Sequence, residues 1–202
     1  PLSSEHDELL FIVIHQSYEL WFKEMIHEFK AAQKALVKGE THRTLAILGR
    51  IRTILKICVS QVDILETMTP LQFNSFRGRL SASSGFQSAQ FRELEAHLGR
   101  RDSKMDGHLP AEMRSKITEI KNSRSLWDST LLYLSMRGHK IPDRYLNRDF
   151  SKPYEANKEV QDILVEVHRI DQESAMVCER LVDFDEGLQE WRYRHVKMVE
   201  RT

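Results

Sequence analysis

The strongest constraint on the fold is a helical apolar pattern near the start of the chain. No glycine or proline interrupts the sequence between Pro1 and Gly39, so nothing there breaks a helix. Apolar residues recur in this stretch at intervals of three and four positions, which puts them on one face of a helix. They are Leu9, Leu10, Val13, Ile14, Leu20, Trp21 and Met25. Such a long helix needs other long helices to cover its apolar face, so the pattern predicts an all-α fold.

Similar patterns follow along the rest of the chain. The predicted helices are 41–68, 70–77, a segment ending at 98 that Gly99 closes, 110–122, 125–137 and 157–202, the last with a break at 184–187. Ser4 with Asp7 resembles a capping box for the first helix, and Thr69 and Ser125 are expected N-caps. No alternating pattern typical of a strand occurs. We therefore expect one domain, 1–202, of long antiparallel helices.

Composition narrows the class of protein. Lysine plus arginine and aspartate plus glutamate number 30 each, and a chain without net charge has no bulk field that attracts nucleic acid or an anionic membrane. No apolar run approaches the roughly 20 residues that cross a bilayer. Cys58 and Cys178 show neither metal-ligand spacing nor a disulfide framework, so we expect a cytoplasmic protein.

Two histidines are candidate site residues. His15 follows the apolar run 11–14, and a histidine on the apolar face of a helix needs partners for its ring nitrogens. It is either a core histidine bonded to a carboxylate or carbonyl, or a site residue. His195 lies in the segment 191–196, and a neutral imidazole on a rigid helix is able to ligate haem iron. A surface histidine among basic residues has the same pattern, so the residues alone leave both alternatives open.

Arginine and phenylalanine residues give a weaker signal. Arg77 stands among aromatic residues before a serine-rich loop, where it either clamps a carboxylate through two hydrogen bonds or stabilises a helix end. Phe11, Phe73 and Phe91 are either core residues or pocket walls. The chain contains no complete di-iron, nucleotide-binding, zinc-protease or serine-hydrolase motif. These residues by themselves indicate only a helical domain.

Five sequence segments, taken together, resemble the tryptophan 2,3-dioxygenase family. They occur in the order of that family and span essentially the whole chain. The segments are HDELLFIVIHQSYELW at 6–21, LETMTP at 65–70, FR at 76–77 followed by SSGFQS at 83–88, GHKIP at 138–142 and WRYRHV at 191–196. The resemblance implies an enzyme dependent on haem b that uses O2 to open the indole ring of L-tryptophan, giving N-formylkynurenine. It also implies a helical bundle around a haem pocket and assembly as a homotetramer.

The resemblance further implies roles for individual residues. His195 would be the axial ligand of the haem iron. His15 would be the catalytic residue on the side of the haem where the substrate binds, and it would accept a hydrogen bond from the indole N–H. Arg77 would pair with the carboxylate of tryptophan. The other implied site residues are the walls of the indole pocket, Phe11, Phe73 and Phe91, and two residues that line the pocket near the haem edge, Ser84 and Gly85.

Departures from the family pattern bear on the pocket. Some members carry tyrosine where Phe73 and Phe91 stand, and phenylalanine keeps the wall but lacks the hydroxyl. The family's tyrosine-bearing upstream segment and the Gly-Thr-Gly-Gly loop after its haem-ligand helix are not found in 1–202. Without these two parts we expect an open pocket.

Two other functions are compatible with the sequence. One is that of a superfamily monooxygenase that inserts a single oxygen atom into a methylated tryptophan, because one methyl group in a pocket changes specificity by only ~1–3 kcal/mol. The mass of the product distinguishes it from a dioxygenase. The other is a non-enzymatic helical haem-binding or sensor protein, which a red preparation without tryptophan turnover would indicate.

Overall fold

The computed structural model describes residues 1–80, 88–104 and 106–201. Helices are the only regular structure in these ranges, which confirms the all-α prediction. The helices are α1 (His6–Leu36), α2 (Thr41–Glu66), α3 (Pro70–Arg77), α4 (Ala89–Leu98), α5 (Ala111–Lys121), α6 (Leu126–Met136), α7 (Asp143–Leu146), α8 (Lys158–Ile170) and α9 (Gln172–Glu200). Among the described residues, none of these helices has both the length and the hydropathy that a membrane span requires.

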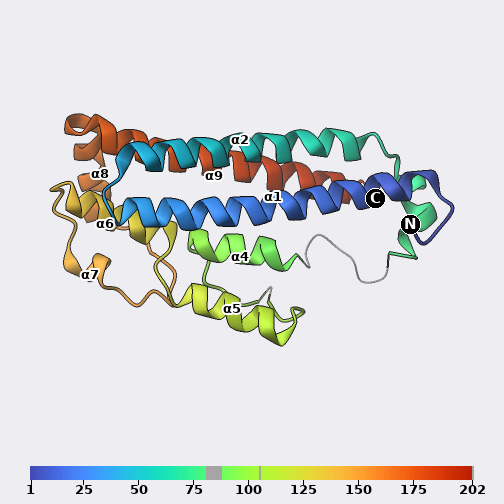
Figure 1. Ribbon diagram of the computed structural model, residues 1–202, viewed down its shortest axis with the longest axis horizontal. Helices are drawn as coiled ribbons and strands as arrows, with labels where there is room; N and C mark the ends of the chain where they lie inside the picture. Colours follow the sequence, from blue (N-terminus) through green and yellow to red (C-terminus); the bar gives the residue numbers. More distant parts are fainter. Residues whose placement is uncertain (81–87, 105, 202) are drawn as a thin grey trace.

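Three long helices, α1, α2 and α9, pack side by side along the length of the molecule (Figure 1). α1 runs antiparallel to α9, because Phe29 meets Phe184 at 5.2 Å between ring centroids and Phe22 meets Trp191 at 5.8 Å. α2 follows α1 after a short turn and also runs antiparallel to it. α2 and α9 consequently run parallel to each other.

The shorter helices pack around this group of long helices. α4 and α6 pack against α1, α5 packs against α4, and α8 packs against α9 (Figure 1). The continuous apolar core therefore lies between α1 and its neighbours, and its largest fully buried side chains include Tyr133, Phe29 and Met25.

Most of the predicted helix ends are confirmed. The Thr69 hydroxyl accepts from the backbone N–H of Gln72, and Ser125 caps α6 in the same way. Gly99 ends α4 with a φ of 117°, in the left-handed region that favours glycine. The capping box predicted at the first helix is wrong, since its N-cap is Glu5, whose side chain makes no capping hydrogen bond.

The break predicted at 184–187 is also wrong, because α9 continues through it and the chain breaks at Asp171 instead. Asp171 is the N-cap of α9 and accepts hydrogen bonds from Ser174 Oγ at 2.6 Å and from Arg137 Nη2 at 3.0 Å. His139 Nε2 lies 3.2 Å from the same carboxylate. These contacts hold the pKa of Asp171 far below its ordinary value, with the Arg137 hydrogen bond the largest cause, so the carboxylate is ionised and stabilises the start of α9.

Gly187 explains why a glycine is found inside α9. A Cβ atom at this position would lie 2.9 Å from Cδ2 of Leu55, a buried residue of α2. The missing side chain thus lets α9 approach α2 closely. Phe184, three residues earlier, is buried against Phe29 of α1. The glycine is a packing residue here and does not end the helix.

Two glycine-to-alanine substitutions test this packing. Gly49 lies inside α2, and a Cβ atom added there would meet no neighbouring atom within 4 Å, so Gly49→Ala is expected to raise the free energy of unfolding by ~0.5–1 kcal/mol. Gly187→Ala gains the same helix propensity but forces Leu55 to move. Its free energy of unfolding is therefore expected to be lower than that of the wild-type protein. Urea unfolding of both variants measures the difference. Equal gains in stability would show that α9 has room at Gly187.

Candidate active site

A cavity of about 1050 Å³ lies between α1 and the C-terminal half of α9. Its walls also include residues just before and just after the range 81–87. Aromatic side chains supply much of the apolar wall, among them Phe11, Phe22 and Trp191, while Lys23 and Arg79 bring positive charge to the lining. The cavity thus combines a largely apolar interior with a few polar groups, which is typical of sites for cofactors and small molecules.

His15 lies on α1 and lines this cavity. Its Nδ1 is 2.7 Å from the carbonyl oxygen of Phe11, one helical turn earlier. A carbonyl only accepts, so Nδ1 carries the proton and Nε2 carries the lone pair. Burial lowers the pKa of His15 most, while the Phe11 carbonyl and Glu19 act in the opposite direction. His15 therefore has the carbonyl partner expected of a core histidine and still presents a wall of the cavity.

His195 lies on α9 and lines the same cavity. Its ring is stacked on that of Trp191, with centroids 5.3 Å apart and an angle of 14° between the planes. Burial lowers its pKa most, and electrostatic coupling to the nearby His15 lowers it further. Both effects favour the neutral imidazole, the form that binds metals. The fold thus brings together two histidines that lie near opposite ends of the sequence.

The three predicted phenylalanines occupy different positions. Phe11 lines the cavity, and its ring is 4.0 Å from that of His15. Phe73 lies behind it on α3, 5.5 Å from Phe11. Phe91 is buried on α4 against Trp191, with centroids 5.2 Å apart, and is not among the residues that line the cavity. Only one of the three therefore forms the wall directly, and Phe91 supports the wall from behind.

Arg77 lies in the last turn of α3, with its guanidinium 5.6 Å from the ring centroid of Phe73. It is exposed and is not among the cavity-lining residues, whereas Arg79, two residues later, is. Ser84 and Gly85 lie outside the described residues. The arginine expected to bind a carboxylate thus stands beside the cavity on a short helix that contacts α1.

An aromatic cluster in the wall of the cavity is a part of the site that the sequence does not predict. Tyr18 and Phe22 of α1 pack on Trp191, and the Tyr18 hydroxyl donates to the carbonyl of Cys58 at 3.1 Å. Burial raises the pKa of Tyr18 to about 12, so the phenol remains protonated. The positions 11, 15, 18 and 22 follow helical spacing, which is the available sequence signal that these residues share one face.

No group of three or more His, Cys, Asp or Glu side chains among the described residues is arranged to hold a metal ion directly. Direct coordination by several protein ligands therefore finds no support in this part of the chain. A metal that arrives inside an organic macrocycle needs as few as one protein ligand, so the absence of such a group from the described residues does not bear on a haem site.

Comparison with known proteins supplies a family. The family model for tryptophan 2,3-dioxygenase matches residues 2–109. The chain is 55% identical over 206 aligned positions to tryptophan 2,3-dioxygenase of Anaeromyxobacter sp. (strain K), covering all of this chain and 77% of that relative. It is 51% identical to the Herpetosiphon aurantiacus enzyme of the same name, covering 98% and 76%, and 42% identical to that of Caulobacter vibrioides, covering 100% and 78%.

Proposed function

The chain belongs to the tryptophan 2,3-dioxygenase family, and on that premise we propose how its cavity binds haem and L-tryptophan. The protein is a haem-dependent dioxygenase, and its reaction opens the indole ring of L-tryptophan between C2 and C3. Both atoms of O2 end in the product, N-formylkynurenine. None of the relatives reported above is named as a monooxygenase or a sensor.

The residues that line the cavity fit a haem group. The volume of about 1050 Å³ lies just above the roughly 300–1,000 Å³ that cofactor and ligand sites usually occupy. The wall is aromatic and apolar, as a porphyrin face requires, and His195 contributes a half-buried imidazole whose pKa is lowered by burial, which favours the neutral form. The chemistry that haem b supplies when bound is the activation of O2 at its iron. In this proposal His195 would hold the haem iron, and the position of its half-buried imidazole in the cavity wall is the observation that carries it.

His15 orients the substrate. Because Nδ1 donates to the Phe11 carbonyl, the acceptor nitrogen Nε2 is the one that remains for the indole N–H of tryptophan. The ring of Phe11 packs against the imidazole at 4.0 Å and restricts its rotation. An imidazole held in one tautomer and one orientation positions the indole without a change in its own protonation state.

Two arginines are candidates for the carboxylate of tryptophan. A carboxylate bound in a largely apolar cavity needs a cation, and a guanidinium binds it through two parallel hydrogen bonds. We assign this role to Arg77, because α3 holds it next to Phe73, which contacts the cavity wall at Phe11. Arg79 is itself one of the described residues that line the cavity, and it serves as the natural comparison. Ser84 and Gly85 complete the proposed pocket near the haem edge.

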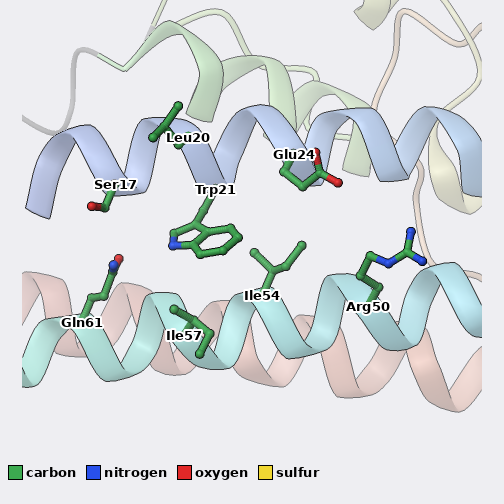
Figure 2. Close-up of a pocket in the computed structure, with 8 residues that line it drawn as sticks. All are labelled: Ser17, Leu20, Trp21, Glu24, Arg50, Ile54, Ile57 and Gln61. Carbon is green, nitrogen blue, oxygen red and sulfur yellow. The ribbon is translucent and has the colours of Figure 1, made fainter.

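A homotetramer is the proposed assembly. α1 and α2 expose large apolar side chains on one face, including Leu9, Val13 and Leu20 of α1 and Ile57 and Ile64 of α2. Figure 2 shows part of this face, a groove in which Trp21 reaches across from α1 toward Ile54 and Ile57 of α2. Exposed apolar surface of this kind is typical of an interface between subunits.

Replacing the proposed ligand tests the haem site. His195→Ala is expected to lose bound haem and the absorbance of the Soret band, because the iron loses its protein ligand. His168→Ala is the matched control, since that histidine is exposed on α8 and bonds to Leu164 and Glu179. Haem content per chain and the visible spectrum are measured after reconstitution. Full haem content with an unchanged spectrum in His195→Ala would remove His195 from the site.

The role of His15 predicts discrimination at the indole nitrogen. His15→Ala is expected to weaken tryptophan binding by ~0.5–1.5 kcal/mol, the net value of one hydrogen bond, while haem remains bound. Binding of 1-methyltryptophan, which has no N–H to donate, should change little. Titrations of both ligands into both proteins make the comparison. An equal loss for the two ligands would argue against a hydrogen bond from His15.

The two arginines are separated by paired substitutions. Arg77→Ala is expected to weaken tryptophan binding by ~3–5 kcal/mol, or about two to three orders of magnitude, because the carboxylate loses its partner. Tryptamine, which lacks the carboxylate, should bind wild type and variant alike. Arg79→Ala should have the smaller effect on tryptophan. If Arg79→Ala shows the large loss and Arg77→Ala does not, the carboxylate belongs to Arg79.

Assembly is checked by light scattering. The proposed homotetramer has four times the mass of the chain, and Leu20→Glu is expected to yield smaller species because it brings a charge to the apolar face. Arg114→Glu on α5 is the control, since Arg114 is an exposed polar residue on another helix. A monodisperse monomer for the wild-type protein would contradict the proposal.

A further inference from the structure

Trp191 forms the closest aromatic contact of His195 among the described residues. The two side chains lie one helical turn apart on α9, with nearly parallel rings 5.3 Å apart. Stacking involves the faces of the rings, whereas the lone pair of an imidazole nitrogen lies in the ring plane. The indole therefore restrains the orientation of the imidazole and leaves its in-plane ligand positions unobstructed by the stack.

Trp191 is itself held by three aromatic rings from other helices. Tyr18 and Phe22 of α1 present their edges, at 5.8 Å each and at interplanar angles of 75° and 89°. Phe91 of α4 packs at 5.2 Å with a tilt of 43°. Only 7% of Trp191 is exposed to solvent. Edge-to-face packing is favourable, and two such contacts together with the tilted contact of Phe91 restrict the orientation of the indole.

The surrounding rings are fixed in turn. The Tyr18 hydroxyl donates to the Cys58 carbonyl of α2 at 3.1 Å, which ties the α1 ring to a second helix. The guanidinium of Arg92 lies 5.0 Å from the ring centroid of Phe91. The position of Trp191 thus depends on α1, α2 and α4 together. Because the imidazole of His195 stacks on this indole, its orientation depends on the same three helices.

We propose that Trp191 is a positioning residue that fixes the ring of His195 for ligation of haem iron. This inference rests on the proposed function, in which His195 is the axial ligand. A histidine that must be immobilised on binding loses rotational freedom, and this loss is smaller when the ring is already restrained. Groups that orient a metal-binding histidine typically change metal affinity 10–100-fold. Here a stacked indole has this role.

The test compares two substitutions at Trp191. Trp191→Phe keeps a flat ring over the imidazole and is expected to keep haem affinity close to wild type. Trp191→Leu keeps apolar volume without a ring and is expected to weaken haem affinity about tenfold or more. Haem is titrated into the cofactor-free protein and followed at the Soret band. The iron–histidine vibration of the reduced, haem-loaded protein should broaden or shift in Trp191→Leu and stay sharp in Trp191→Phe.

Trp127→Leu is the matched control. Trp127 lies on α6, its ring centroid is 5.7 Å from that of Tyr154 in an edge-to-face contact, and it is not among the cavity-lining residues. It should leave haem affinity and the vibration unchanged. Wild-type haem affinity in folded Trp191→Leu, or an equal loss in Trp191→Phe, would overturn the inference.

A second variant covers the case in which Trp191→Leu does not fold. Phe91→Leu removes one ring that holds Trp191 and leaves the cavity-lining residues unchanged. Like Trp191→Leu, it is expected to weaken haem affinity. An unchanged affinity would count against the inference. His195→Ala separates the two levels of the argument. If His195→Ala keeps its haem, the proposed ligand is wrong. If it loses haem while Trp191→Leu does not, only the positioning role fails.

Discussion

The packing of α9 along both α1 and α2 is the contact on which the candidate site depends. α9 carries His195, α1 carries His15, and the cavity lies where the two helices face each other. α9 approaches α2 closely because Gly187 of α9 has no side chain opposite Leu55 of α2. Near the other end, Arg194 binds Glu66 of α2 at 2.8 Å, which fixes α9 at the residue beside His195. A shift of α9 along its neighbours would therefore move the proposed iron ligand relative to the substrate side.

Local chemistry then sets the state of each histidine. Burial lowers the pKa of both His15 and His195, so neither needs to lose a proton near neutral pH. The Phe11 carbonyl selects the tautomer of His15, and the Trp191 indole restrains the ring of His195. One fold thus gives two chemically identical side chains different surroundings, with a hydrogen bond at His15 and an aromatic stack at His195.

The sequence predicts most features that depend on neighbours within one helical turn, with the capping box at Ser4 and Asp7 as the exception. Helical periodicity and the caps at Thr69 and Ser125 are of this kind, and the structure confirms them. The break predicted at Gly187 is wrong because a helix-interior glycine has the same local signal whether it ends a helix or admits another helix. His15 and His195 follow from family resemblance, but the stack on Trp191 and the placement of Arg77 outside the cavity lining depend on packing between helices far apart in sequence.

The parallel course of α2 and α9 also has a consequence for how the protein folds. Parallel neighbours cannot be joined by a tight turn, so the whole of 67–171 separates them along the chain. Contacts between such distant segments form slowly, because a long loop must close before they contribute stability. We therefore expect α1 and α2, which are adjacent in sequence, to pair first. α9 is expected to dock afterwards onto their apolar surface, which is exposed until then. Because the proposed haem ligand lies on α9, we expect haem to bind late in the maturation of this protein, and we expect newly made chains to be most prone to aggregate before α9 docks.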